Sequence, residues 1–187
     1  MVQKNNAGRT VLITRFSAVG DIAMTLPLLY SLCRKYPGHR FAFVSRERFG
    51  QFFINKPENL DFIGVNPDNY KGIHGLFRLY RELSRKVSPD SVADLHDVLR
   101  TKILRTYFRL LAGCRCAHII KGRKEKKALT RKENKCTTPL KSTFERYREV
   151  FTRLGLPFEP EFNSLFGEGK GDISEFAAFL PPKNGDK

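Results

Sequence analysis

The chain has 187 residues, of which 41% are hydrophobic, so it is long enough for one domain with a buried core and too apolar to be intrinsically disordered. No apolar run approaches the roughly 18 residues of a membrane-spanning helix, and residues 1–6 lack the apolar core of a signal peptide, so we expect a cytoplasmic protein. The 34 Lys and Arg residues outnumber the 19 Asp and Glu residues, and the formal net charge of +15 predicts an anionic partner.

The first elements surround a short turn. Residues 1–9 are a polar tail that we expect to be flexible. The apolar residues 11–13 lead into Ser17-Ala18-Val19-Gly20-Asp21, and apolar residues then recur at helical spacing over residues 22–33. This pattern predicts a strand, a tight glycine turn and a helix, and the helix stops at Tyr36-Pro37-Gly38.

The position of Asp21 has two interpretations. The turn lies at the carboxyl end of a strand and beside a helix N-terminus, which is where open parallel sheets bind ligands. Asp21 stands where the helix begins, so it is either an ordinary helix cap or a residue that contacts a ligand.

The chain then alternates between strands and helices, with a loop rich in Pro, Asn and Gly at residues 66–74. Short runs of apolar residues predict strands at residues 40–44, 60–65, 91–95 and 115–120. Apolar residues at helical spacing predict helices at residues 46–53, 76–87 and 100–111. This alternation predicts an α/β fold with a parallel sheet and right-handed crossovers.

The last third of the chain is strongly basic. We expect a turn at residues 121–124, then a mobile or partly helical loop to residue 141, then a helix over residues 142–154 that a capping box of Ser142 and Glu145 begins. Between Arg100 and Arg153 there are 17 Lys or Arg residues and only four Glu residues. A solvated helix face would intersperse acids, so this distribution favours a binding surface for an anion.

The domain boundaries follow from composition. Residues 10–165 carry the strand and helix patterns and form one predicted domain. Pro, Glu, Asn and Gly dominate after residue 158, and one short helical candidate lies at residues 173–180. We therefore interpret residues 166–187 as a linker.

Metal and cofactor motifs are weak or absent. A metal site could be drawn from Cys114, Cys116, His118 and Cys136, but zinc ligand pairs usually have roughly two to four residues between them. The phosphate-binding motifs G-x-x-x-x-G-K-[ST] and G-x-G-x-x-G do not occur, and residues 167–171 lack the strand and helix that such a loop needs. We expect no metal and no cofactor.

Three ordered stretches are similar to motifs of the lipopolysaccharide heptosyltransferase family, glycosyltransferase family 9. They are Arg15 to Ile22 with Thr25-Leu26-Pro27, then Ala93 to Thr101, then Phe144 to Glu149 with Leu154-Gly155-Leu156. The resemblance covers about residues 11–157 and only the N-terminal half of the family. It implies a doubly wound, mostly parallel, Rossmann-like sheet that forms one half of a GT-B glycosyltransferase.

The resemblance also implies an activity and its residues. The chain would be the acceptor-binding half of an inverting enzyme that transfers heptose from ADP-heptose to the lipopolysaccharide inner core. Asp21 matches the catalytic base, and Ser17 and Gly20 would shape the turn and contact the acceptor. The donor-binding domain would follow residue 187, so we expect the chain alone to be inactive.

Further acceptor-binding candidates lie at or just past strand ends. They are Arg15, His96, Arg100, Arg123 and Lys124. The resemblance places His96 in the acceptor cleft, whereas Asp97 stands where the family commonly has Gly, which changes the expected turn. We interpret Asp94 as a structural carboxylate bonded to nearby backbone N–H groups, with a binding role as the alternative.

The basic residues agree with an anionic glycolipid, because the Kdo-lipid A core presents carboxylates and phosphates to Arg and Lys. Residues 126–135 are predicted to touch the anionic cytoplasmic face of the inner membrane, which would make the protein peripheral to it. Two alternatives are a nucleic-acid-binding module, which we disfavour because no such motif is present, and a non-catalytic acceptor-binding partner of a separate donor-binding chain.

Overall fold

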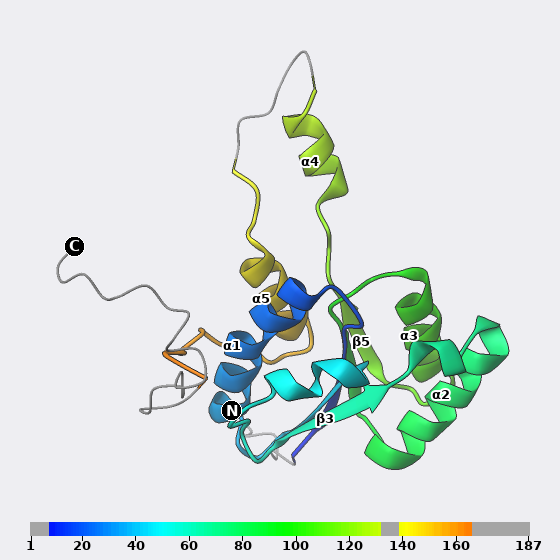
Figure 1. Ribbon diagram of the computed structural model, residues 1–187. Coiled ribbons are helices and arrows are strands. Elements are labelled where there is room, and N and C mark those ends of the chain that lie inside the picture. The colour runs from blue at the N-terminus through cyan, green and yellow to red at the C-terminus, as the bar shows by residue number, and fades with distance from the viewer. Residues whose placement is uncertain (1–7, 132–138, 166–187) are drawn as a thin grey trace, which may run out of the picture.

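A computed structural model describes residues 8–131 and 139–165, and these residues form a parallel sheet covered by helices on both faces (Figure 1). The strands are β1 (Thr10–Thr14), β2 (Arg40–Arg46), β3 (Leu60–Val65), β4 (Ser91–Asp94) and β5 (Arg115–His118). The α-helices are α1 (Val19–Lys35), α2 (Gly72–Val87), α3 (Leu99–Leu111), α4 (Arg123–Leu129) and α5 (Thr143–Arg153). Two 3₁₀ helices are η1 (Glu47–Phe52) and η2 (Pro67–Asn69).

The order of the strands is β3-β2-β1-β4-β5, and every neighbouring pair is parallel. The chain builds β1, β2 and β3 toward one edge and then returns to place β4 on the other side of β1. The predicted doubly wound Rossmann-like sheet is therefore confirmed, and the point where the winding reverses lies between β1 and β4.

Alternating side chains of the strands supply two apolar cores. Val11 and Ile13 of β1 are fully buried on the face that α1 and α5 cover, and Leu12 is fully buried on the face of α2 and α3. Figure 1 shows the two helix pairs on opposite sides of the sheet. Since successive residues of a strand point to opposite faces, a strand buried on both sides is a continuous apolar run.

Most predicted elements are confirmed, with differences at their ends. The helix predicted at residues 46–53 is the 3₁₀ helix η1, and β5 ends two residues earlier than predicted. Helix α2 begins at Gly72, inside the predicted loop, and its first residue has a positive φ of 66° that glycine adopts without steric cost. The helical candidate at residues 173–180, the linker 166–187 and most of the predicted tail lie outside the described residues.

The structure also confirms two predictions for the last third of the chain, the capping box and the partly helical basic loop. The predicted capping box is present, because Ser142 Oγ accepts from the Glu145 amide at 3.2 Å and Glu145 Oε2 accepts from the Ser142 amide at 2.6 Å. The basic loop is partly helical and contains α4, which stands away from the body of the protein (Figure 1). Among the described residues, no helix has both the length and the apolar character to cross a membrane.

Arg146 of α5 binds the backbone just before α4 and just before α5. Its guanidinium donates to the carbonyls of Ile120 at 2.8 Å and Lys141 at 3.1 Å, and it pairs with the Glu125 carboxylate at 2.8 Å. Gly122 lies against it with a φ of 60°, and a side chain there would meet the guanidinium nitrogens at 2.5 Å. The root of the α4 segment is therefore tied to α5 by a largely buried Arg.

The core contains one polar atom whose removal should stabilise the protein. Tyr147 of α5 is fully buried, and its hydroxyl has no hydrogen-bond partner within the described ranges. Leaving a buried hydroxyl unpaired costs roughly 1–3 kcal/mol. We expect Tyr147→Phe to raise the free energy of unfolding by about 1 kcal/mol, as measured by urea denaturation.

Tyr30→Phe is the matched control. Tyr30 is also buried in the same core, with 3% of its surface exposed, but its hydroxyl donates to the Ile54 carbonyl at 2.6 Å. This substitution should lower the free energy of unfolding by about 1 kcal/mol. Equal losses in both variants would contradict the assignment of an unpaired Tyr147 hydroxyl.

Candidate functional site

The candidate site lies where the turns after β1 and β4 meet, at the carboxyl ends of two adjacent parallel strands. The turn after β1 runs from Arg15 to Ala18, and the turn after β4 runs from Leu95 to Val98. In doubly wound sheets the reversal point opens a crevice between such turns, because the two chains leave in opposite directions.

Arg15 holds the first turn together from inside the protein. Its buried guanidinium donates to the Leu95 carbonyl and forms an ion pair with Asp21, and it lies 5.5 Å from the centroid of the Tyr147 ring. Asp21 Oδ2 takes part in this ion pair and also accepts from the Ala18 amide at 3.2 Å. Asp21 therefore caps α1, as the simpler interpretation predicted, and a third of its side chain remains exposed.

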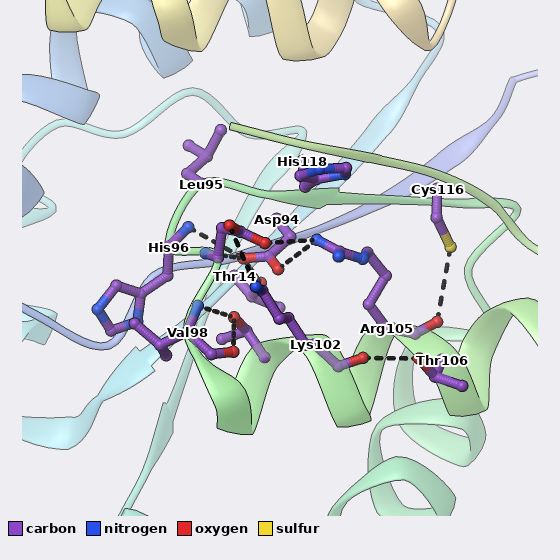
Figure 2. A network of polar contacts seen from close by, with 12 residues as sticks. Thr14, Asp94, Leu95, His96, Val98, Lys102, Arg105, Thr106, Cys116 and His118 are labelled. Carbon is purple, nitrogen blue, oxygen red and sulfur yellow. Dashed lines mark hydrogen bonds and ion pairs between the residues drawn. The ribbon is translucent and has the colours of Figure 1, made fainter. Parts of the chain in front are cut away.

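Asp94 holds the second turn. Its carboxylate is fully buried at the end of β4, where Oδ1 accepts from the backbone amides of His96 and Asp97, each at 2.9 Å. Arg105 reaches from α3 to Oδ2 at 2.8 Å, as Figure 2 shows, and the Thr14 hydroxyl approaches Oδ1 at 3.4 Å. The structural interpretation of Asp94 is confirmed, because backbone amides are among its partners.

Asp97 adopts the backbone conformation that the family's Gly would suit. Its φ is 45°, in the left-handed region, which Asp tolerates better than most residues. Its carboxylate lies 3.4 Å from Arg105 and 3.7 Å from Lys102, and its carbonyl accepts from Lys121 at 3.2 Å. Asp97 therefore occupies a backbone conformation that glycine adopts without steric cost, and its side chain adds links to α3.

The ring of His96 points away from this network (Figure 2). It contacts Ser17 of the turn after β1. The Phe16 amide lies 3.5 Å from Nδ1 and can only donate, so Nδ1 acts as an acceptor and the ring proton lies on Nε2. Nε2 is 3.1 Å from Ser17 Oγ, which then accepts. Burial, together with the charges of Arg15 and Lys121, lowers the pKa of His96 to about 4, so the ring is neutral at pH 7.

An open hollow of about 700 Å³ lies beside this pair, between the ends of β1 and β4 and the first turns of α2 and α3. Three predicted acceptor-binding residues, Ser17, His96 and Arg100, line it together. Sequence reasoning missed Arg46, Tyr70 and the residues from the start of α2. Arg46 ends β2, so the strand-end rule that selected Arg100 could have found it, whereas the contribution of α2 had no signal in a predicted loop.

The other predicted site residues lie elsewhere. Arg15 and Asp21 form their ion pair outside the lining of the hollow, and Gly20 lies exposed in the first turn of α1, where a side chain would meet open space. Arg123 is exposed at the start of α4, and Lys124 follows it in that helix, with its side chain outside the described atoms. Catalysis by Asp21 and acceptor binding by Arg15, Gly20, Arg123 and Lys124 stay predictions.

The thiols of Cys114 and Cys116 lie against backbone carbonyls. Cys114 Sγ lies 3.0 Å from the Pro89 carbonyl and Cys116 Sγ lies 3.7 Å from the Arg105 carbonyl. Burial raises the pKa of Cys116 to about 11, which keeps it a thiol at neutral pH. No group of three or more potential ligand side chains comes together within residues 8–131 and 139–165, and Cys136 lies outside them.

Solved glycosyltransferases share this fold. A glycosyl transferase family 9 protein from Veillonella parvula is 21% identical and matches over 83% of this chain and 44% of its own, with a TM-score of 0.58. Escherichia coli heptosyltransferase WaaC, also 21% identical, matches as its complex with ADP over 83% of this chain and 49% of its own, with a TM-score of 0.53. Its complex with ADP-2-deoxy-2-fluoro heptose matches over 92% and 55%, with a TM-score of 0.54.

These matches confirm the predicted resemblance at the level of the fold. The chain spans about half the length of the solved structures it matches. No protein-family model matches the chain, and no curated protein matches it significantly in sequence.

Removing the buried charge at the end of β4 should unfold much of the site. In Asp94→Asn, Arg105 keeps only the more distant Asp97 carboxylate at 3.4 Å, and breaking a buried ion pair costs roughly 3–5 kcal/mol. We expect a loss of this size in the free energy of unfolding, measured by urea denaturation. Asp61→Asn, which breaks the exposed ion pair with Arg40, should cost less than about 1 kcal/mol. Similar losses in both variants would show that the buried Asp94–Arg105 pair stabilises the fold no more than an exposed ion pair does.

His96 should titrate far below an ordinary histidine. The unfolded chain binds the proton below about pH 6.5 and the folded chain only below about pH 4, so protonation of His96 destabilises the fold as the pH falls through that window. An NMR titration of the histidine ring protons, assigned with His96→Gln, should give a pKa near 4. A pKa near 6.5 would mean that the ring is solvated and does not contact Ser17.

Proposed function

We propose that the chain is the acceptor-binding half of an inverting glycosyltransferase that transfers heptose from ADP-heptose to the inner core of lipopolysaccharide. The observation that carries the proposal is the place of the family-like motif. Residues 15–21 span the β1–α1 turn and the start of α1, at the reversal point of a sheet whose fold matches heptosyltransferase WaaC over most of this chain. The ADP and ADP-heptose analogue in the WaaC structures support a nucleotide sugar as the donor.

Asp21 is the proposed catalytic base. Its Oδ2 carries both the ion pair with Arg15 and the contact with the Ala18 amide, and no partner of Oδ1 is found within the described part of the chain. Oδ1 would take the proton of the acceptor hydroxyl while the hydroxyl oxygen forms a bond to the anomeric carbon of heptose. The bond from that carbon to the diphosphate breaks from the opposite side, and ADP leaves with the bonding electrons.

The acceptor is proposed to be the anionic Kdo-lipid A core. Arg100 is the cation of the predicted set that lines the hollow, and a guanidinium can bind a carboxylate through two parallel hydrogen bonds. Ser17 and His96 would bind sugar hydroxyls, since the neutral ring leaves the serine hydroxyl hydrogen free to donate. Gly20 would allow a close approach to the start of α1.

The exposed basic residues of α4 are proposed to face the membrane. Lys126 and Lys127 are exposed on α4, in a segment that stands away from the body of the protein (Figure 1). Basic residues near an anionic bilayer surface each contribute about 1 kcal/mol to attraction. This contact would bring the protein to the cytoplasmic face of the inner membrane, where the glycolipid is found.

Acceptor binding by the chain itself tests the proposal. We expect isothermal titration calorimetry to show saturable binding of a deacylated, Kdo-bearing lipid A core. Arg100→Gln should weaken it by 10-fold to 100-fold, the range for about 1.5–3 kcal/mol of a charged hydrogen bond. Arg109→Gln, an exposed Arg at the other end of α3, should change it less than about twofold.

Two further results would contradict parts of the proposal. Equal binding of a single-stranded oligonucleotide at matched salt, unaffected by Arg100→Gln, would favour a nucleic-acid-binding surface instead. Transfer of heptose from ADP-heptose by the chain alone would contradict the assignment of the donor site to a second domain.

A further inference from the structure

The lining of the hollow combines two kinds of side chain. Most of its walls are apolar. The β1–α1 turn, helix α2, the β4–α3 turn and helix α3 contribute Phe16, Leu76, Val98 and Ile103 in that order. The charged members, Arg46 and Arg100, are both cations, and no Asp or Glu is among the lining residues. A sugar alone would leave these apolar walls without a partner, because hydroxyl groups gain little from contact with hydrocarbon.

The mouth of the hollow is also apolar. Ile73 from α2 and Leu99 from α3 line it and are 64% and 75% exposed. Single exposed apolar residues are ordinary, but a group that continues into an apolar hollow marks a surface that a ligand covers.

One cation at the hollow has an unused donor. Arg46 Nε is buried and has no hydrogen-bond partner among the residues that the structure describes. This N–H has almost no solvent-accessible surface, so an anionic oxygen in the hollow would reach it only after the side chain shifts, whereas the positive charge of the whole Arg46 guanidinium group lines the hollow and attracts an anion as it stands. Of the polar groups nearby, Ser17 and the neutral His96 bind each other, so they do not neutralise the two guanidinium charges.

We propose that the hollow binds an amphiphilic anion, with its hydrocarbon chain along the apolar walls and its phosphate or carboxylate at Arg46 and Arg100. This inference rests on the proposed function for the natural source of the ligand, because an anionic glycolipid acceptor carries acyl chains. It adds that the chain recognises hydrocarbon as well as sugar and charge. The site would then select acylated acceptors over their deacylated forms.

A series of alkyl phosphates tests the proposal without any sugar. We expect calorimetric titration, below the critical micelle concentrations, to show affinity rising from butyl to octyl phosphate by about fourfold per added methylene, which corresponds to about 0.8 kcal/mol. Inorganic phosphate should bind far more weakly, and so should a neutral octyl glycoside, which lacks the anion. Equal affinity across the chain lengths, or equal binding of the neutral glycoside, would overturn the proposal.

Two surface residues of α3 provide a matched pair of variants. Leu99 and Leu110 are 75% and 73% exposed, but only Leu99 lines the hollow. Leu99→Ser should weaken octyl phosphate binding by about tenfold, while Leu110→Ser leaves it unchanged within twofold. Equal effects of the two substitutions would show that alkyl phosphates adsorb to exposed apolar residues in general, and the hollow would not be the site.

The two proposals fail in different ways. Binding of the deacylated Kdo acceptor without any dependence of alkyl phosphate affinity on chain length would overturn the hydrocarbon site alone. Binding of alkyl phosphates through Leu99 without binding of the Kdo acceptor would overturn the proposed glycosyltransferase function and leave a site for another amphiphilic anion.

Discussion

The buried carboxylate of Asp94 is the interaction on which the candidate site depends. A charge that folding removes from water must be compensated by partners, and here the partners come from three directions. They are Arg105 on α3, the amides of His96 and Asp97 in the turn, and the Thr14 hydroxyl on β1. The turn after β4, helix α3 and the turn that follows β1 all line the hollow, so one buried charge holds together much of the site.

The β1–α1 turn divides its side chains between two tasks. Arg15 points into the protein, where it links the first turn to the Leu95 carbonyl of the second turn and holds Asp21 at the start of α1. Ser17 contacts His96 on the side of the hollow. Arg15 of this turn holds the Asp21 carboxylate, and Ser17 of the same turn lines the hollow. One short segment would therefore position both an acceptor in the hollow and a base at the start of α1.

The sequence predicted the elements better than their arrangement. Alternating apolar runs separated by Pro and Gly located the five strands of the described residues. The family resemblance selected Ser17 and His96 and the strand-end rule selected Arg100, and the structure brings these three residues together. The contribution of α2 was missed because Gly72 and the polar residues before it are typical of a loop, whereas the helix forms through packing of its later turns against the sheet. The order of the strands, and hence which turns meet, has no local signal in the sequence.

The basic residues of this chain fall into two groups: those that bind backbone carbonyls within the fold, and those that line the hollow, Arg46 and Arg100. Several cations of the last third bind backbone carbonyls: Arg115 donates to the carbonyl of Arg153 at 3.4 Å, and Arg153 donates to the carbonyls of Glu149 at 3.1 Å and His118 at 2.5 Å. These hydrogen bonds give partners to carbonyl groups near the ends of β5 and α5. They cancel no charge, because a carbonyl group carries only a dipole. The positive potential therefore persists even where each guanidinium has a structural partner. A fold that uses Arg in this way remains attractive to anions over its whole basic end, so net charge alone brings an anionic ligand near, and only the lining of the hollow can decide where it binds.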